Sequence, residues 1–229
     1  MRTRAKIGIG VAAMAGMAAI AVLGLLAADR AFPPPLEGAQ IVSPEVRDAD
    51  GELLRAFATS EGRWRLKTTV ADVDPQFLKM LIAYEDRRFY EHRGIDPLAF
   101  GRAFFQLVSH GRIVSGGSTL TMQVARLIEP RAERSVAAKL LQMFRAFQIE
   151  RRLSKTEILN LYLTHAPYGG NLEGVRAASL AYFGREPGRL DVAQAALLVA
   201  LPQLPEKRRP DRNAEAAAKV RARVLNRAA

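Results

Sequence analysis

A long uncharged segment near the N-terminus constrains the fold of this chain more than any other feature. From Ile7 to Ala28 the sequence contains only Ala, Gly, Ile, Leu, Met and Val. A helix that rises about 1.5 Å per residue needs roughly 20 apolar residues to cross a hydrocarbon layer of about 30 Å. Residues 7–28 are therefore predicted to form one membrane-spanning helix, preceded by a short tail of residues 1–6.

The charges that flank this segment predict its orientation. Basic residues precede it, whereas Asp29 and Arg30 follow it. Because positive charge is retained on the cytoplasmic side, we expect a cytoplasmic tail and a domain on the periplasmic or other extracytoplasmic side of the plasma membrane. A cleaved signal peptide with a small-residue site at 26–28 is the alternative, although the apolar part of a signal peptide is usually shorter. The basic residues are Arg2, Arg4 and Lys6.

The rest of the chain has the size of one domain with a hydrophobic core. Prolines 33–35 indicate a stiff spacer within a linker of residues 29–40, which leaves residues 41–229 for the domain. The net charge of +11 attracts anions such as phospholipids, nucleic acids or phosphorylated substrates. Nucleic acid is disfavoured because the domain is expected outside the cytoplasm. The sequence has no cysteine, so it offers neither a disulfide nor a thiolate metal site.

The pattern of apolar residues predicts a mainly α fold. The one strong β signal is a hairpin within Ile41–Phe57, around the turn dipeptide at residues 50–51. A capping Asp74 and Pro75 begin a helix that runs toward Glu85. Further helices are expected at 97–109, 118–127, 133–152, 154–163, 174–183 and 191–201, and from residue 212 onward.

Two groups of large apolar residues in these helices are interpreted as core. The first is a stripe at helical spacing in 133–152, which comprises Val136, Leu140, Met143, Phe144 and Phe147. The second comprises Phe100, Phe104 and Phe105, for which contact with the membrane is the alternative.

Acidic, basic and aromatic residues crowd together in the segment from Glu85 to Gly94, directly after an apolar helix. An acidic pair is more often a solvated helix end with arginine partners than a catalytic group. A carboxylate in a partly desolvated cleft, however, has the raised basicity that a general base needs. Both interpretations of Glu85 remain open from this segment alone.

Two more segments carry polar residues in suggestive positions. Ser115 to Gln123 places glycines and hydroxyls before a helix, where free backbone N–H groups bind anions. An ordinary capped loop is the alternative. In the helix 133–152, the residues Lys139, Gln142, Ala146 and Glu150 share one face, which is either solvated or the second wall of a cleft.

Taken together, these segments resemble the motifs of the family 51 glycosyltransferases, which occur in class A penicillin-binding proteins and as monofunctional transglycosylases. The first motif is matched at Glu85, Asp86, Phe89, His92 and Gly94, and the second from Gly116 to Gln123. Lys139 to Glu150 is similar to the third motif. The fourth is matched at Leu161 to Leu163, Tyr168 to Asn171, and Gly174 to Val175. The resemblance covers residues 41–226 and implies a lysozyme-like, mainly α glycosyltransferase domain.

The third motif departs from the family pattern. Ala138 stands where the family usually has arginine, and Gln142 stands where most members carry a second glutamate. Gln142 and Met122 together resemble the branch of penicillin-binding protein 1C. The signatures Ser-x-x-Lys and Lys-Thr-Gly of a transpeptidase do not occur, so we expect a glycosyltransferase without that domain, as a monofunctional protein or as part of a longer one.

The resemblance implies an inverting polymerisation of lipid II into β-1,4-linked glycan, with release of undecaprenyl pyrophosphate. Glu85 is then the catalytic base. Implied partners are lipid II, the growing glycan strand, membrane lipids and other cell-wall synthases, and no nucleic acid. The residues expected to bind substrate or pyrophosphate are Asp86, Phe89, His92, Gly116, Ser118, Thr119, Gln123, Arg126, Lys139 and Gln142.

A divalent cation, Mg²⁺ or Mn²⁺, is implied by the resemblance alone, because the sequence shows no metal-ligand spacing. His92 is expected to form a structural hydrogen bond within its own loop. Two other functions stay open: a lysozyme-like hydrolase, which also uses one dominant glutamate, and a silent membrane scaffold, which the loss of a carboxylate at Gln142 allows.

Overall fold

The computed structural model describes residues 2–110, 117–131 and 135–228, and the chain divides into two compact units, Met1–Pro34 and Pro35–Ala229. The first unit contains the helix α1, Arg2–Ala31, which includes the uncharged segment 7–28. In the part of the chain that the structure describes, no helix is both long and apolar enough to cross a membrane. The membrane anchor therefore stays a prediction.

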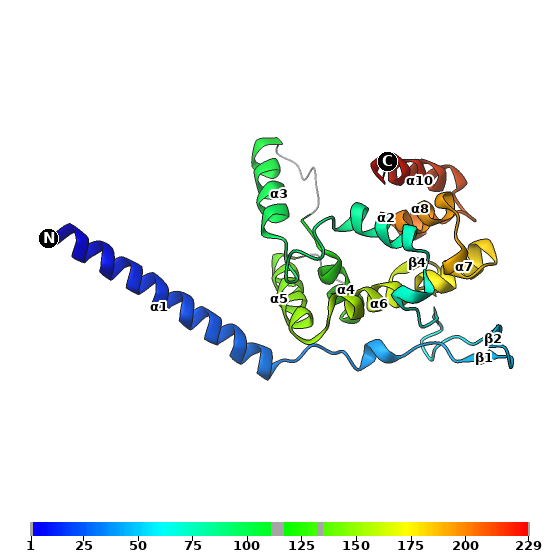
Figure 1. Ribbon diagram of the computed structural model, residues 1–229, viewed down its shortest axis with the longest axis horizontal. Helices are drawn as coiled ribbons and strands as arrows, with labels where there is room; N and C mark the ends of the chain where they lie inside the picture. The colour runs from blue at the N-terminus through cyan, green and yellow to red at the C-terminus, as the bar shows by residue number, and fades with distance from the viewer. Residues whose placement is uncertain (1, 111–116, 132–134, 229) are drawn as a thin grey trace. The chain divides into compact units, whose positions relative to one another are not determined.

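The second unit is mainly helical, which confirms the predicted class (Figure 1). Its α-helices are α2 (Pro75–Glu85), α3 (Pro97–His110), α4 (Leu120–Ile128), α5 (Val136–Arg152), α6 (Lys155–His165), α7 (Val175–Phe183), α8 (Val192–Ala200), α9 (Pro205–Arg208) and α10 (Ala214–Ala228). The 3₁₀ turns are η1 (Gly38–Gln40), η2 (Val70–Asp72), η3 (Pro187–Arg189) and η4 (Leu201–Gln203).

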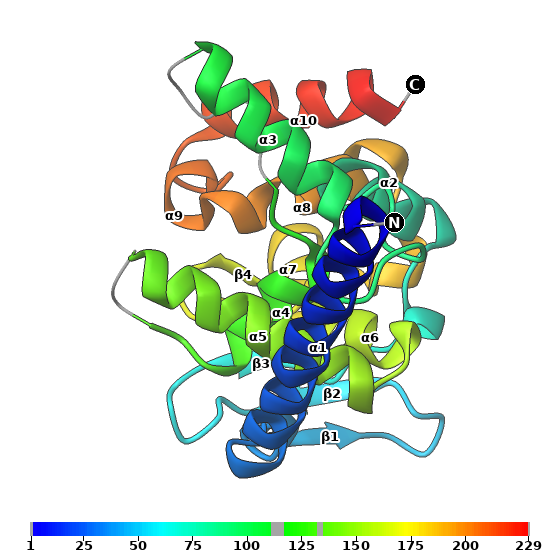
Figure 2. The same ribbon diagram turned by 90° about the vertical axis from the view of Figure 1, so that its left-hand side faces the viewer.

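The hydrophobic core joins the helices of this unit along their apolar faces. α8 packs against both α2 and α10, and α4 packs against α5 and α6 (Figures 1 and 2). Phe77 of α2, Leu120 of α4, Leu163 of α6 and Leu198 of α8 are completely buried in one cluster. The last helices of the chain therefore cover the helix that ends at Glu85.

The helix boundaries follow from capping side chains. Asp74 accepts a hydrogen bond of 2.7 Å from the backbone N–H of Gln76, and Pro75 occupies the first position of α2, as predicted. Ser154 and Glu157 form the predicted capping box of α6. At α4 the cap is Thr119, so the helix begins at Leu120, two residues after the predicted start at 118.

Two small sheets accompany the helices. The predicted hairpin is confirmed as β1 (Glu45–Arg47) paired antiparallel with β2 (Leu53–Ala56), and its turn contains a glycine at residue 51 with a φ of 84°. A second sheet of β3 (Trp64–Arg65), β4 (Pro167–Gly169) and β5 (Leu172–Glu173), in the order β3-β5-β4, was not predicted. Its strands are too short to show a period of two, and they pair across long sequence separations.

The interpretation of two apolar groups as core was wrong in large part. At the start of α5, Val136 is 78% exposed and Leu140 is 60% exposed, and full burial begins only at Ala146. On α3, Phe100 and Phe105 are also exposed, while the side chain of Phe104 lies outside the described residues. Helical spacing identifies an apolar face, but it does not reveal whether another element covers that face.

Candidate active site

Glu85 is the last residue of α2, a helix that Phe77, Met80 and Leu81 fix in the core. The C-terminal end of a helix carries a partial negative charge, which disfavours the ionised form of a carboxylate placed there. The side chain is half-buried at this end. Its position alone therefore makes Glu85 a stronger base than an exposed glutamate.

Two amides hold the carboxylate of Glu85. Gln123 Nε2 donates to one oxygen at 2.8 Å, and Gln203 Nε2 donates to the other at 2.7 Å. Burial raises the pKa of Glu85, whereas the two amides and the charges of Arg208 and Arg227 lower it, and the net effect is a raised pKa. The two amides thus orient the carboxylate, and no described residue forms a direct ion pair with it that would reduce its basicity.

Two buried tyrosines from the fourth motif lie near Glu85. Burial raises the pKa of Tyr162 and of Tyr168, and the charge of Glu85 raises both further. Both phenols are therefore neutral at pH 7. In the described residues, the buried hydroxyl of Tyr162 has no hydrogen-bond partner. These rings supply the low-dielectric surroundings that keep Glu85 basic.

Asp86, the neighbour of Glu85, points into the protein. Its carboxylate contacts His92 Nε2 at 3.0 and 3.1 Å and accepts a 2.9 Å hydrogen bond from the backbone N–H of Leu120. Asp86 and His92 are both buried. This geometry agrees with the structural hydrogen bond expected for His92, but it places neither residue where a substrate could touch it. They tie the loop after α2 to the start of α4.

Thr119 makes the second tie between these segments. Its hydroxyl donates to the carbonyl oxygen of Gly94 at 2.6 Å and accepts from the N–H of Met122 at 3.1 Å. Gly94 has a φ of 90°, and a Cβ added there would lie 2.8 Å from the carbonyl oxygen of Ala146. The motif therefore needs glycine for both its backbone conformation and its packing.

The N-terminus of α4 is consequently less available to an anion than the sequence suggested. The N–H of Leu120 is taken by Asp86, and that of Met122 by Thr119. Gly116, the other predicted ligand in this loop, lies outside the described residues. An anion site in this region therefore has to rest mainly on side chains.

Phe89 and Glu150 belong to the buried side of the motif. Phe89 is completely buried, and Lys155 Nζ lies 4.4 Å from its ring centroid. Glu150 accepts hydrogen bonds from Lys155 at 2.7 Å and from Thr121 at 2.6 Å. Neither Phe89, which was predicted to bind substrate, nor Glu150, which was predicted to lie on one wall of a cleft, lines a cleft here.

The accessible part of the third motif is formed by Lys139 and Gln142. Lys139 Nζ donates to Ser118 Oγ at 2.7 Å and to Gln142 Oε1 at 3.1 Å. Gln142 Nε2 donates to the carbonyl oxygen of Met122 at 2.6 Å. Because a glutamate at 142 could not donate this bond, Gln142 is suited to its place here. The α4 residues Met122 and Gln123 thus connect Gln142 with Glu85.

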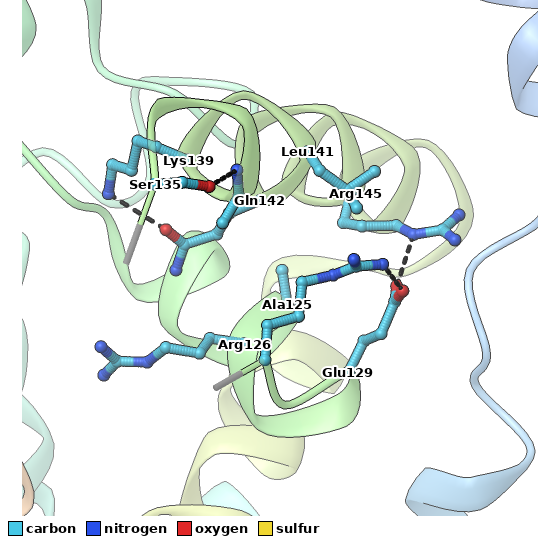
Figure 3. A pocket seen from close by; sticks show the side chains of 10 residues that line it. Ala125, Arg126, Glu129, Ser135, Lys139, Leu141, Gln142 and Arg145 are labelled. Atoms are coloured by element: carbon cyan, nitrogen blue, oxygen red, sulfur yellow. Dashed lines mark hydrogen bonds and ion pairs between the residues drawn. The ribbon is translucent and has the colours of Figure 1, made fainter. Parts of the chain in front are cut away.

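A cationic pocket opens between α4 and α5, with a volume of about 520 Å³ (Figure 3). Among the described residues, its lining contains Arg126, Arg131, Lys139 and Arg145, against one acidic residue, Glu129. Figure 3 shows Arg145 paired with Glu129, whereas Arg126 extends away from Glu129 toward the side of Lys139. Burial and the charge of Arg126 lower the pKa of Lys139. An anion bound in this pocket would relieve that repulsion.

The described residues contain no group of three or more histidines or carboxylates able to hold a metal ion. The two amides turn their NH₂ groups toward Glu85, and Arg126 and Lys139 are cations, so these groups do not present the carboxylate, carbonyl and water oxygens that Mg²⁺ or Mn²⁺ prefer. The divalent cation implied by the resemblance therefore stays a prediction.

Three residues close to Glu85 were missed from the sequence. Gln203, Arg208 and Arg227 come from η4, α9 and α10, more than a hundred positions after Glu85 along the chain. No local pattern marked them, because an isolated glutamine after Pro202 and arginines in a basic helix look like solvated surface. The packing of α8 and α10 against α2 brings them to the site.

Comparison with known proteins identifies relatives over most of this chain. The family model described as Transglycosylase matches residues 50–229. Penicillin-binding protein 1C of Escherichia coli K12 is 47% identical over 202 residues, 88% of this chain and 26% of that protein. Penicillin-binding protein 1A of Vibrio cholerae is 36% identical over 84% of this chain and 23% of that protein, and that of Aquifex aeolicus is 38% identical over 80% and 25%.

The chain thus spans about a quarter of the length of these relatives. A crystal structure of penicillin-binding protein 1A from Haemophilus influenzae has a TM-score of 0.43 and 20% identity, and covers 82% of this chain and 18% of that one. The assignment therefore depends on the family model and the sequence relatives. Because the model matches most of the chain, and the motif around Glu85 lies inside the match, the chain belongs to the transglycosylase family.

Proposed function

We propose that this chain polymerises lipid II into β-1,4-linked glycan and that Glu85 is the base. The observation that carries the proposal is the position of a carboxylate with a raised pKa, connected through α4 to a pocket with excess positive charge. A base and a site for a departing anion are the two elements that such a transfer needs. The membership in the transglycosylase family supports the same reaction.

The proposed reaction is a single displacement with inversion at the anomeric carbon. The 4-hydroxyl of the GlcNAc unit of lipid II forms a bond to the anomeric carbon of the MurNAc at the end of the growing strand. Its proton passes to Glu85. The bond from that carbon to the pyrophosphate oxygen breaks, and the electron pair leaves with undecaprenyl pyrophosphate. Glu85 then releases its proton to solvent, so that the next cycle can begin.

Positive charge in the cationic pocket stabilises the departing pyrophosphate in this proposal. Arg126 and Lys139 extend to the same side of the pocket (Figure 3). Lys139 is partly desolvated there, and the charge of Arg126 acts on it. Ser118 and Gln142 fix the ammonium group of Lys139. Fixed charges of this kind act without reorganising during the reaction, which is where their catalytic effect arises.

The proposal extends to the place where the chain works. Lipid II has its reacting head group at a membrane surface, and α1 contains the uncharged segment that we interpret as a single-pass anchor in the plasma membrane. The catalytic unit then lies on the periplasmic or extracytoplasmic side. Lipids, the growing strand and other cell-wall synthases are its proposed partners, and nucleic acid is not among them.

Polymerisation of labelled lipid II in detergent or vesicles tests the function. We expect the wild-type chain to form glycan and Glu85→Gln to lose roughly 10³-fold in rate, within the range for removal of a general base. Glu91→Gln is the matched control, because Glu91 lies in the same segment, is 65% exposed and forms an ion pair with Arg88 on the surface. Full polymerisation by Glu85→Gln, or cleavage of finished glycan in place of synthesis, would contradict the proposal.

A further inference from the structure

The carboxylate of Glu85 accepts hydrogen bonds from two side-chain amides, one on each oxygen, and only one of these amides lies in a motif identified from the sequence. Gln123 belongs to the second motif, whereas Gln203 lies in η4, 118 positions after Glu85. Given the proposed role of Glu85 as the base, we propose that Gln203, itself fixed by Arg208, is a positioning residue that holds this carboxylate in the orientation for proton abstraction.

The orientation of the Gln203 amide follows from its neighbours. Arg208 Nη1 donates to Gln203 Oε1 at 3.2 Å, and a guanidinium group can only donate. The oxygen of the amide must therefore face Arg208, which leaves the NH₂ group to face Glu85. Arg208 is itself buried, and its Nη1 donates to the carbonyl oxygen of Ala200 at 2.6 Å. The hydrogen bonds therefore run in one direction: Arg208 donates to Gln203, and Gln203 donates to Glu85.

The amide between the two charges has a chemical consequence. An arginine in direct contact with a carboxylate typically lowers its pKa by about 1–3 units, which would make it a weak base. Here the charge of Arg208 acts across Gln203, and burial still raises the pKa of Glu85 above its usual value. Gln203 therefore restricts the rotation of the carboxylate while leaving it basic.

The other groups that face Glu85 do not replace Gln203. Arg227 from α10 acts at a distance through its charge and lowers the pKa of Glu85. Tyr162 on α6 and Tyr168 on β4 are buried phenols whose own pKa is raised by burial and by the charge of Glu85, so both stay neutral and add no charge beside it. Gln123 holds only the second oxygen. Removal of Gln203 therefore leaves the first oxygen of Glu85 without its protein donor and with freedom to turn.

The surroundings of Gln203 make this idea testable without unfolding the chain. Leu201 and Pro202 are buried and anchor η4, whereas the side chain of Gln203 is exposed. A substitution there creates no cavity in the core. Gln203→Met removes the donor at similar size, and Gln203→Lys replaces the neutral donor by a cation. The control is Gln76→Met, at an exposed glutamine on the first turn of the same helix α2.

The experiment combines a titration with kinetics on the full chain. The Glu85 carboxyl carbon is followed by ¹³C NMR in protein labelled at glutamate, and its signal is assigned by its loss in Glu85→Gln. We expect Gln203→Met to move the midpoint of the Glu85 titration to higher pH and Gln203→Lys to move it to lower pH. Gln76→Met should leave this midpoint unchanged. In lipid II polymerisation, kcat of Gln203→Met should fall roughly 3- to 10-fold with little change in KM, as for the loss of one hydrogen bond of ordinary strength at an exposed residue.

The outcomes separate this inference from the proposed function. Equal midpoints and equal pH profiles of kcat in wild type, Gln203→Met and Gln203→Lys would overturn the positioning role while leaving Glu85 as the base. If the Glu85 titration midpoint shifts in these variants but the wild-type chain forms no glycan, the contact of Gln203 with Glu85 is supported and the proposed polymerase function is contradicted. A fall in activity for Gln203→Met with neither a shifted midpoint nor a shifted profile would also overturn the proposal.

Discussion

Glu85 and Asp86 are adjacent acids in one motif, yet they lie in two different regions of the molecule. Glu85 belongs to an open region with Lys139 and Gln142, where polar groups are accessible and partly desolvated. Asp86 belongs to a buried network with His92 and Thr119, in which hydrogen bonds join the loop to α4. One sequence motif can therefore combine residues that take part in chemistry with residues that stabilise the fold.

The sharpest separation of the two regions is expected from Lys139→Met. Loss of a fixed cation near a departing pyrophosphate should reduce the polymerisation rate by roughly 100-fold. Because burial and Arg126 already lower the pKa of Lys139, its charge does not stabilise the fold, and the melting temperature should stay equal or rise slightly. Lys79→Met, at an exposed lysine on α2, is the control. A loss of activity that follows only from unfolding would place Lys139 in the structural region instead.

The buried network is tested by Asp86→Asn. The amide oxygen would keep the N–H of Leu120, and the NH₂ group would face His92, whose ring would then have to accept at Nε2 and carry its proton on Nδ1, a buried atom without a partner among the described residues. We expect a loss of about 2 kcal/mol in the free energy of unfolding, measured by chemical denaturation. Asp50→Asn in the exposed hairpin turn should change little. Unchanged stability together with a large loss of activity would move Asp86 into the open region.

Gln142→Glu examines the departure from the usual family pattern. A carboxylate cannot donate to the carbonyl oxygen of Met122, and it would neutralise Lys139 beside it. We therefore expect a moderate fall in polymerisation, roughly 5-fold, as for the loss of one ordinary hydrogen bond of about 1 kcal/mol. Steady-state rates against Gln142→Met, which lacks both charge and donor, give the comparison. An inactive wild-type chain that gains activity from Gln142→Glu would instead support the silent scaffold.

The smallest expected effect concerns stability against pH at Glu85. A carboxyl group whose pKa is raised by folding binds protons more tightly in the native state, so it lowers stability as pH rises from the unfolded value through the folded pKa. Below the unfolded value this contribution disappears. The free energy of unfolding, measured by denaturation at a series of pH values, should therefore fall more steeply from acidic to neutral pH for wild type than for Glu85→Gln. If the free energy of unfolding depends on pH equally in both proteins, folding does not shift the pKa of Glu85.

Local chemistry made most of the helices predictable. Asp74 and Pro75 mark the start of α2, and Ser154 and Glu157 mark the start of α6. Each of these residues caps the first turn of its own helix, so the signal is local in sequence. The hairpin turn at residues 50–51 is local in the same sense. The second sheet was not predictable, because β3 and β5 are short and meet only through the folded chain. The exposed face of Val136 and Leu140 was misjudged for the related reason that coverage by neighbours is not local.

The helical class, the motif that contains Glu85, and the presence of Lys139 and Gln142 on one helix face could all be inferred from the amino-acid sequence. These features depend on residue type and spacing along a single element. The inward direction of Asp86, the contact of Gln203 with Glu85 and that of Arg208 with Gln203 became visible only in the folded chain. The direction of a side chain and its distant partners result from the packing of α8 and α10 against α2, and that packing involves the whole core rather than any one segment.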